Sequence, residues 1–273
     1  MTTKSNLHTH CTYCDGRNTI DEMIRSAIGA GFVSIGFSSH SPTGFSTDEC
    51  QVRDVEGYFN ELERERQKYE GIIDVFKGME LESRKVGEVR PVIDPRCDYT
   101  LGALHRFRTN DRCYEVDYTA ERWLEALKAF GSVKALVENY FEELASFAEE
   151  VDFDIIAHMD LYTKFNEKEK IFDENEKWHK DMAIHYAERL AKTGKIFEVN
   201  TGAMSRGYRS VPYPAKYILK RLLELKAPII LSSDSHNVNT ICYAFDETEK
   251  MLKDMGFKEQ MRLTRDGFVS VPL

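Results

Sequence analysis

Residues 6–40 read NLHTHCTYCDGRNTIDEMIRSAIGAGFVSIGFSSH, and this stretch decides the fold class. A short strand-like run, Asn6–Thr9, precedes the sequence TIDE at 19–22, a capping box that begins a helix. Gly31 is placed to end that helix. Val33–Phe37 then forms an apolar run without polar alternation, which is typical of a strand buried on both faces. The stretch therefore predicts one strand–helix–strand unit.

The same alternation continues along the rest of the chain. Strands are expected at Asn6–Thr9, Val33–Phe37, Asp74–Glu80, Tyr99–Leu104, Phe153–Ala157, Ile196–Asn200 and Ile229–Ser232. Helices are expected at residues 19–31, Asp54–Tyr69, Ala120–Phe130, Val133–Glu150, Glu174–Thr193, Ala215–Leu225 and Thr240–Met255. Alternating elements predict a parallel α/β architecture, either an incomplete (β/α) barrel or a doubly wound sheet. No linker or shift in composition divides the chain, so residues 1–273 are expected to form a single domain.

The composition is that of an ordinary globular protein with an acidic balance. The 273 residues contain 37 Lys and Arg against 46 Asp and Glu, which gives a formal net charge of −9. Hydrophobic residues make up 42% and charged residues 30%, so disorder is not expected. A general nucleic-acid binder would be basic, and nucleic acid is therefore excluded as the expected partner. The same charge also argues, at first sight, against an anionic substrate.

The N-terminus and the cysteines indicate a cytoplasmic protein. The first residues are polar and lack the apolar stretch of a signal peptide, and no apolar run reaches the roughly 18–20 residues of a membrane helix. No membrane partner is therefore expected. Without a secretory signal, disulfides are not expected among the six cysteines Cys11, Cys14, Cys50, Cys97, Cys113 and Cys242.

Metal-binding residue types gather at the C-terminal ends of the expected strands. Of eight histidines, the six at or just past such an end are His8, His10, His40, His105, His158 and His236. Three carboxylates, Asp15, Glu80 and Asp234, occupy similar places. His8 and His10 are two residues apart, so both rings point to the same face of a strand. In a parallel barrel these ends converge on one rim.

These nine residues favour a cluster of metal ions. Imidazole suits Zn, Mn or Fe, and carboxylates can bridge two ions. One tetrahedral zinc site needs three or four ligands, so nine candidates indicate two or three ions. A lone histidine after a strand is usually a hydrogen-bonded core or loop residue, and it is the joint occurrence that favours metal. His179 and His185 lie within a helix and are not candidates.

The ordered set His8-x-His10, Asp15-Gly16, His40, Glu80, His105, His158 and Asp234-x-His236 resembles the four motifs of the PHP (polymerase and histidinol phosphatase) family of metallo-phosphoesterases. The resemblance extends from residue 6 to the C-terminus, and it implies a distorted (β/α)7 TIM-like barrel. In one departure, the family usually has Ser-Asp-Gly where this chain has Cys14-Asp15-Gly16. The carboxylate is retained.

The resemblance also implies three divalent ions, of Zn, Mn or Fe. The first ion would be held by His8, His10, Glu80 and Asp234. The second would share Glu80 and add His105 and His158. The third would take Asp15, His40 and His236.

Within the family, GFSSHSP at 36–42 and GFVSVPL at 267–273 resemble the L-histidinol-phosphate phosphatases of histidine biosynthesis. This resemblance implies a small phosphorylated substrate, histidinol phosphate, and leaves the oligomeric state open. The hypothesis is in-line attack of a metal-bridging hydroxide on phosphorus, without a phosphoenzyme, with Glu80, Asp234 and His236 as the catalytic residues. Asp234, or a histidine acting through water, would protonate the leaving group.

Cations near the strand ends are candidates for binding the phosphate, because phosphate oxygens not held by metal favour cationic partners. They are Arg17, Lys164 and Arg206. Glu115 and Asp117, on the loop after the fourth strand, are candidate partners for the amino group of histidinol. Either could instead be part of a charged lead-in to the next helix.

Three other functions remain open at this point. A PHP phosphoesterase could act on nucleotides or other monoesters, and an amidohydrolase-like enzyme could use Glu80 to bridge its metals while attacking carbon. A metal-binding module without catalysis would leave the arginines unexplained.

Cys11-x-x-Cys14 beside the histidines could form a structural zinc site, but packing is the preferred interpretation. Glu82 is expected in a loop just past its strand.

Overall fold

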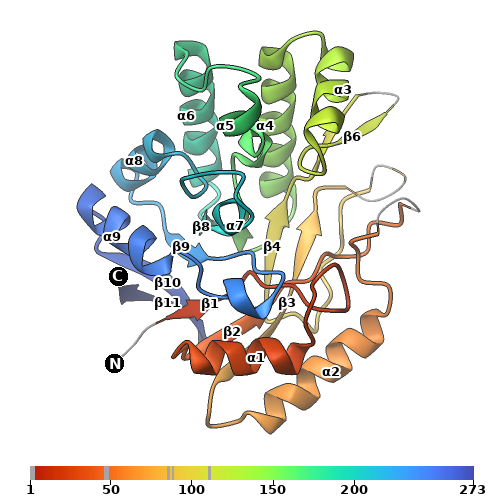
Figure 1. Cartoon of the computed structure of the whole chain (residues 1–273), viewed down its shortest axis with the longest axis vertical. Helices are drawn as coiled ribbons and strands as arrows, with labels where there is room; N and C mark the ends of the chain where they lie inside the picture. The colour runs from red at the N-terminus through yellow and green to blue at the C-terminus, as the bar shows by residue number, and fades with distance from the viewer. Residues whose placement is uncertain (1–3, 46–48, 85–86, 88, 110–111) are drawn as a thin grey trace.

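The computed structural model describes residues 4–45, 49–84, 87, 89–109 and 112–273. Within these residues, the centre is a parallel sheet with the strand order β1-β2-β3-β4-β7-β8-β9 (Figure 1). Every neighbouring pair in this order is parallel. The strands are β1 (Ser5–Asn6), β2 (Ser34–Phe37), β3 (Asp74–Glu82), β4 (Tyr99–Ala103), β7 (Ile155–Ile156), β8 (Ile196–Asn200) and β9 (Ile229–Ser232).

The sheet curls into a nearly closed barrel. A parallel bridge between Thr9 and Ser235 joins the segments that follow β1 and β9. The backbone N–H of His10 donates to the carbonyl of Ser235 at 2.8 Å, and the N–H of Ser235 donates to the carbonyl of His8 at 3.2 Å. The strand order follows the chain and never reverses, which confirms the barrel and excludes the doubly wound alternative.

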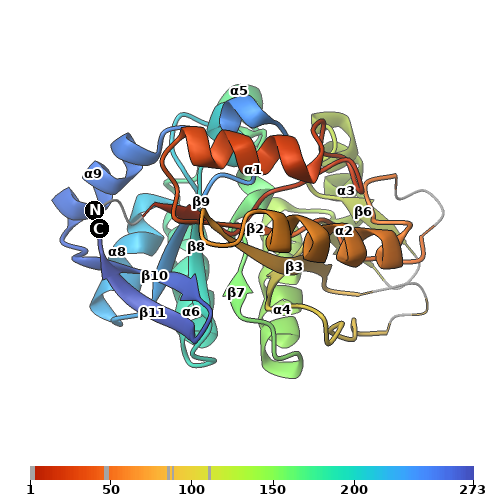
Figure 2. The same ribbon diagram turned by 90° about the horizontal axis from the view of Figure 1, so that it is seen from below.

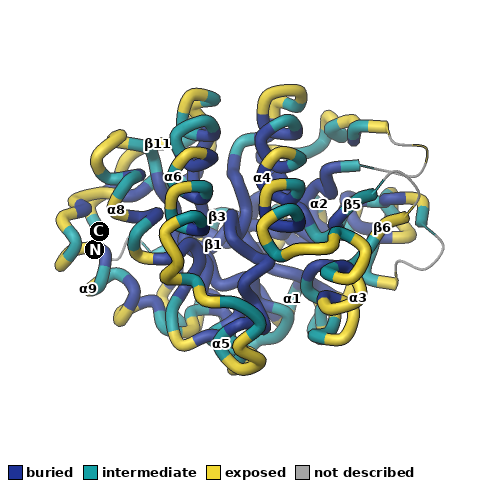
Figure 3. Tube along the Cα trace, turned by 90° about the horizontal axis from the view of Figure 1, so that it is seen from above, coloured by how far each residue is buried: buried dark blue, intermediate teal, exposed yellow. Residues whose placement is uncertain are grey.

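Helices cover the outside of the barrel (Figure 2). Their inner faces are buried and their outer faces exposed, as the tube in Figure 3 shows for α4 and α6. The α-helices are α1 (Ile20–Gly29), α2 (Val55–Lys68), α3 (Ala120–Phe130), α4 (Val133–Glu150), α5 (Asn166–Glu169), α6 (Lys177–Ala191), α7 (Gly202–Ser205), α8 (Lys216–Glu224) and α9 (Phe245–Met255), with short 3₁₀ turns at Leu161–Thr163 and Val238–Thr240. None of the helices in the described part of the chain has the length and apolar character needed to cross a membrane.

The helix N-termini follow the expected chemistry. The Thr19 side chain accepts a hydrogen bond from the N–H of Glu22, and the Glu22 carboxylate accepts one from the N–H of Thr19. This reciprocal pair is the predicted capping box, and it sets the start of α1.

The six cysteines are all free, as the sequence predicts.

The barrel interior is filled by side chains below the rim. The interior apolar cluster contains Leu7, Phe76, Tyr99, Leu101, Ala103, Ile155, Ala157, Ile196, Ile230 and Leu263. The Tyr99 hydroxyl, on β4, donates to the carbonyl of Leu7 at 2.5 Å. A Cβ atom at Gly36 would lie 2.4 Å from the Tyr99 hydroxyl oxygen, so only glycine leaves room for this ring. The filled interior gives the rim above it a rigid base.

Two antiparallel hairpins were not predicted from the sequence. The first pairs β5 (Arg106–Arg108) with β6 (Cys113–Glu115) in the loop after β4. The second pairs β10 (Glu259–Thr264) with β11 (Gly267–Pro272), and its Leu263 packs into the interior cluster. Arg265 in this second hairpin pairs with Asp74, the first residue of β3. The β10–β11 hairpin therefore covers the end of the barrel opposite the metal-binding residue types.

Candidate metal centre

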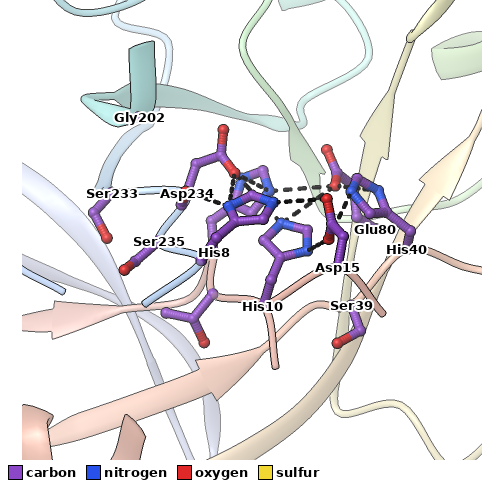
Figure 4. A network of polar contacts seen from close by, with 12 residues as sticks. His8, His10, Asp15, Ser39, His40, Glu80, Gly202, Ser233, Asp234 and Ser235 are labelled. Atoms are coloured by element: carbon purple, nitrogen blue, oxygen red, sulfur yellow. Dashed lines mark hydrogen bonds and ion pairs between the residues drawn. The ribbon is translucent and has the colours of Figure 1, made fainter. Parts of the chain in front are cut away.

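The nine predicted ligands meet at the C-terminal rim of the barrel, where most of them are seen together in Figure 4. They come from the ends of β1, β2, β3, β4, β7 and β9 and from the loop that follows β1. Their nitrogen and oxygen atoms form four overlapping groups, and within each group these atoms lie no more than 4.8 Å apart. The groups are His10, Asp15, His40 and His236; His8, His158 and Asp234; His8, His10 and Glu80; and His40, Glu80 and His105.

Glu80 lies at the centre of these groups, and its two oxygens face different imidazoles. Oε1 is 2.9 Å from Nε2 of His158 and 3.4 Å from Nε2 of His105. Oε2 faces three more rings, with His40 Nδ1 at 3.0 Å, His8 Nε2 at 3.4 Å and His10 Nε2 at 3.6 Å. Burial alone would raise the pKa of Glu80, but the surrounding histidines hold that pKa well below its usual range. The central group is thus an ionised carboxylate.

Asp234 forms a second carboxylate contact with the same rings. Its Oδ1 is 3.4 Å from Nε2 of His10 and 3.6 Å from Nε2 of His8. Its Oδ2 accepts a hydrogen bond from Nη2 of Arg206 at 2.9 Å. Burial opposes ionisation, yet Arg206 and then His8 keep the pKa of Asp234 well below the usual value. One oxygen therefore faces the histidines, while the other is held by an arginine.

Asp15, His40 and His236 form the most exposed part of the cluster. Asp15 Oδ2 is 3.3 Å from Nε2 of His236, and Oδ1 is 3.7 Å from Nε2 of His40. The Asp15 side chain is 31% exposed, whereas those of His8 and His10 are fully buried. The His236 ring stacks on His10 with ring centres 4.0 Å apart, which ties this group to the deeper one.

The donor set fits divalent metal ions. Among the described residues, four buried atoms of this cluster have no hydrogen-bond partner: His8 Nε2, His10 Nε2, Glu80 Oε2 and His158 Nδ1. Buried polar atoms are normally paired, so unpaired nitrogens and a carboxylate oxygen facing one another call for a cation between them. Burial, then the neighbouring His236 and His40, lowers the pKa of His10 to about 3. The neighbouring carboxylates instead raise the pKa of His8, His40 and His105 against the effect of burial, and a metal ion would displace these protons.

The family model for the PHP domain matches residues 6–202, the part of the chain that carries all the predicted ligands except Asp234 and His236. The match covers well over half of the chain. This chain belongs to the PHP domain family. The resemblance noted in the sequence and the barrel predicted from it are thereby confirmed.

Curated relatives of this PHP domain protein include proteins of Schizosaccharomyces pombe and Bacillus subtilis. It is 26% identical to the "Probable histidinol-phosphatase" of Schizosaccharomyces pombe, over 86% of this chain and 81% of that protein. It is 23% identical to the histidinol-phosphatase of Bacillus subtilis, over 89% and 97% of the two chains. The fold matches a crystal structure of the histidinol phosphate phosphatase of Lactococcus lactis, complexed with zinc, L-histidinol and phosphate. That match has a TM-score of 0.74 and 18% identity, and it covers 98% of this chain and 99% of the other.

Two further carboxylates contact the rings of candidate metal ligands from behind. The sequence analysis assigned neither of them to the site. Glu198 Oε1, on β8, lies 2.6 Å from Nδ1 of His8. Glu82 Oε2 lies 3.2 Å from Nδ1 of His105. The expectation of Glu82 in a loop is wrong, because β3 continues beside β4 as far as the pair Glu82 and Ala103. The available signal was a glutamate within an otherwise apolar strand.

The cluster lies at the base of a cavity of about 680 Å³. All the residues predicted to contact substrate line it, namely Arg17, Lys164, Arg206, Glu115 and Asp117. Lys164 Nζ donates to the backbone carbonyl of Asp117 at 2.6 Å and lies 3.2 Å from its Oδ2. Burial opposes ionisation of Asp117, but Lys164 and the nearby His105 lower its pKa to about 2. The backbone N–H of Arg17 donates to the carbonyl of His236 at 2.8 Å, which holds Arg17 beside the cluster.

The two cysteines beside the cluster have a packing role. Cys11 is fully buried, and its Sγ lies 3.4 Å from the Ser39 hydroxyl. Cys14 Sγ lies 3.5 Å from Nδ1 of His10, the ring nitrogen opposite the one that faces Glu80. Burial raises the pKa of Cys11 to about 12 and that of Cys14 to about 11. In the described part of the chain, neither cysteine belongs to a group of side chains placed to hold a metal ion, which favours the packing interpretation.

Proposed function

We propose that this PHP domain protein is a metal-dependent phosphatase that hydrolyses L-histidinol phosphate to L-histidinol and phosphate. The observation that carries the proposal is the place of Glu80, whose two oxygens face separate sets of imidazoles at the base of a cavity lined by cations and carboxylates. The names of the relatives, which match over most of their length, support the choice of substrate.

The proposed centre holds three divalent ions, of Zn, Mn or Fe. When bound, such ions lower the pKa of coordinated water to about 7 and stabilise negative charge on the phosphoryl group. Glu80 would be shared, with Oε1 on the side of His105 and His158 and Oε2 on the side of His8 and His10. Asp234 would complete the set of His8 and His10, and the third ion would be held by Asp15, His40 and His236. The three residues expected to be catalytic would therefore act in the reaction as metal ligands: Glu80, Asp234 and His236.

The cationic side chains would bind the phosphate. Arg17 lines the cavity, and no carboxylate in the described part of the chain pairs with it, so its guanidinium is available for charge-assisted hydrogen bonds. Arg206 is engaged with Asp234 and would hold that ligand in place while it faces the same cavity. Lys164 is fixed by Asp117, and its ammonium group adds positive charge to the cavity wall.

The leaving group of the proposed substrate carries an amino group, and an acidic side chain is its natural partner. Glu115, on β6, lines the cavity. Asp117 is already paired with Lys164, so Glu115 is the carboxylate we propose for this contact. Histidinol would then lie between the metal cluster and the β5–β6 hairpin.

A substrate panel tests the proposal. Metal-loaded protein is assayed for phosphate release from L-histidinol phosphate, nucleoside monophosphates and simple aryl and alkyl monoesters, with metal-free protein as the control. We expect the highest kcat/KM for L-histidinol phosphate and no turnover without metal. A preference for nucleotides would overturn the substrate, and release of phosphate from none of the esters would overturn the activity.

A further inference from the structure

One buried carboxylate outside the proposed ligand set contacts two of its members. Glu198 lies within β8, and its side chain is fully buried. Its Oε1 lies 2.6 Å from Nδ1 of His8. Its Oε2 accepts a hydrogen bond from the backbone N–H of His158 at 2.8 Å. The residue therefore connects the segments that follow β1 and β7, which the proposed function assigns to two different ions.

We propose that Glu198 is a positioning residue that aims His8 and His158 at their two ions together. This inference rests on the proposed function, because it concerns ligands of the proposed metal centre. It adds a residue that holds no ion itself and that acts on two ions through their ligands.

The contact with His8 selects one form of its ring. A carboxylate accepts hydrogen bonds, so the short contact with Glu198 places a proton on Nδ1 of His8. A neutral ring protonated there carries its lone pair on Nε2. Nε2 is the buried atom without a hydrogen-bond partner, and it faces Glu80 and Asp234 at 3.4 and 3.6 Å. Glu198 thus directs the lone pair of His8 into the proposed metal site.

The contact with His158 stabilises an unusual backbone conformation. His158 has a φ of 22°, in the left-handed region that disfavours side chains other than glycine. Its N–H is held by Glu198, and its ring places Nε2 2.9 Å from Oε1 of Glu80. The hydrogen bond to Glu198 offsets part of the cost of a backbone turn that aims the ring at the cluster.

Both oxygens of Glu198 must accept hydrogen bonds. Oε2 also accepts from Nδ2 of Asn200 at 2.9 Å. The amide of Asn200 cannot rotate to offer an oxygen instead, because its Oδ1 already accepts from the N–H of Gly202 at 2.7 Å. Donors therefore face Glu198 on both sides, from His8 on one side and from His158 and Asn200 on the other.

This arrangement makes Glu198→Gln a sharp test. Glutamine has the shape of glutamate but only one acceptor oxygen. With that oxygen toward His158 and Asn200, its NH2 group faces His8 and favours the ring form with the proton on Nε2. That form has no lone pair for a metal ion at Nε2. The variant should therefore keep the fold and lose metal affinity.

The experiment is a zinc titration of metal-free wild type and E198Q against a competing chromophoric chelator, with thermal unfolding of both metal-free proteins to show that they fold. Loss of a partner that orients a metal ligand typically costs about 10- to 100-fold in affinity. Because glutamine keeps the contact with His158, we expect the zinc ion assigned to His8 and His10 to bind about 10- to 100-fold more weakly in E198Q. The ion assigned to Asp15, His40 and His236 should bind as in wild type.

Glu65→Gln is the matched control. Glu65 is also a buried carboxylate, but it lies in α2 and pairs with Lys68 and Arg64, away from the cluster. The zinc affinities of the Glu65→Gln protein should match those of wild type. Three unchanged zinc affinities in E198Q would overturn the inference, as would equal weakening of all three ions. A wild-type protein that binds no zinc tightly would instead overturn the proposed function.

If E198Q does not fold, Glu198→Asp is the variant that tests the inference. Aspartate keeps the charge and both acceptor oxygens, but it is one methylene shorter and cannot maintain the 2.6 Å contact with His8 together with the contact with His158. The zinc ions assigned to His8 and to His158 should both bind more weakly in this variant than in wild type. Zinc binding equal to wild type in E198D would contradict the inference.

Discussion

Glu80 is the residue on which the proposed centre depends most. Its two oxygens face imidazoles on opposite sides, and the surrounding histidines keep it ionised although it is buried. A buried charge without partners is costly, so the native arrangement is favourable only while cations balance it. Any side chain with one acceptor in this position would serve one side of the cluster and leave the other without a ligand.

Glu80→Gln is therefore expected to abolish most of the activity. The amide keeps the shape but offers one oxygen and no charge, so fewer ions should bind and kcat should fall by at least about 100-fold. Elemental analysis of bound metal together with phosphate release measures both effects. Glu65→Gln is the control for loss of a buried carboxylate elsewhere. Full metal content and normal kcat in the Glu80 variant would contradict the bridging role.

Arg17→Ala and Arg206→Ala test the phosphate-binding side chains. A charge-assisted hydrogen bond contributes about 1.5–3 kcal/mol, which corresponds to roughly 10- to 150-fold in kcat/KM. For Arg17, which lines the cavity, we expect the loss mainly in KM. For Arg206 we expect lower kcat as well, because Asp234 loses a partner. Arg265→Ala, at the opposite end of the barrel, is the control, and unchanged kcat/KM in either test variant would refute its assignment.

At the scale of elements, local signals in the sequence determined most of the fold. Helices α3 and α4 have the bounds predicted for them, because Thr119 and Ser132 cap their N-termini and Gly131 takes a left-handed conformation between them. The hairpin β5–β6 was missed because its strands have only three residues each. The hairpin β10–β11 was missed because few residues of its two six-residue strands are buried, so the apolar pattern is weak.

The site was predictable to a similar extent. The nine ligand candidates were recognisable because six histidines and three carboxylates occur together at strand ends, although any one of them alone would usually have another role. Glu198 and Glu82 were not, since a buried glutamate has no sequence signature apart from its place in an apolar strand. Only the register of the barrel shows that these carboxylates lie behind His8 and His105.

The β10–β11 hairpin should contribute stability without contributing to the site. Leu263 is 4% exposed and packs into the interior cluster, so Leu263→Ala should destabilise the protein by about 2–5 kcal/mol. Chemical denaturation measures this loss. Val269→Ala, in the same hairpin at a site that is 37% exposed, should change stability by less than about 0.5 kcal/mol. A reduced kcat in folded Leu263→Ala protein would show that the two ends of the barrel are coupled.

At the scale of the whole molecule, the barrel changes the meaning of the net charge. The −9 of the chain argued against an anionic substrate, but it describes the protein without ions. Three divalent ions would add +6 against the −3 of Asp15, Glu80 and Asp234, which leaves the rim positive by about three charges. An acidic protein with a positive cavity suits a small phosphate ester better than a polyanion.

Metal removal should destabilise the folded protein. The ligands meet only in the closed barrel, so ions bind the native state and not the unfolded chain. At about 100 times the dissociation constant a single ion adds about 2.7 kcal/mol, which corresponds to a rise in Tm of about 5 °C or more. Calorimetry before and after chelation, and after zinc is restored, measures the shift. A Tm insensitive to chelator and to zinc would count against a structural metal centre.

The most direct test of the central claim is a crystal structure of zinc-loaded protein with anomalous data at the zinc edge. We predict separate peaks on the two sides of Glu80, each within about 2.0–2.2 Å of one of its carboxylate oxygens. One peak should lie beside His105 and His158, and the other beside His8 and His10. A single peak, or peaks that leave either oxygen of Glu80 without an ion, would contradict the account.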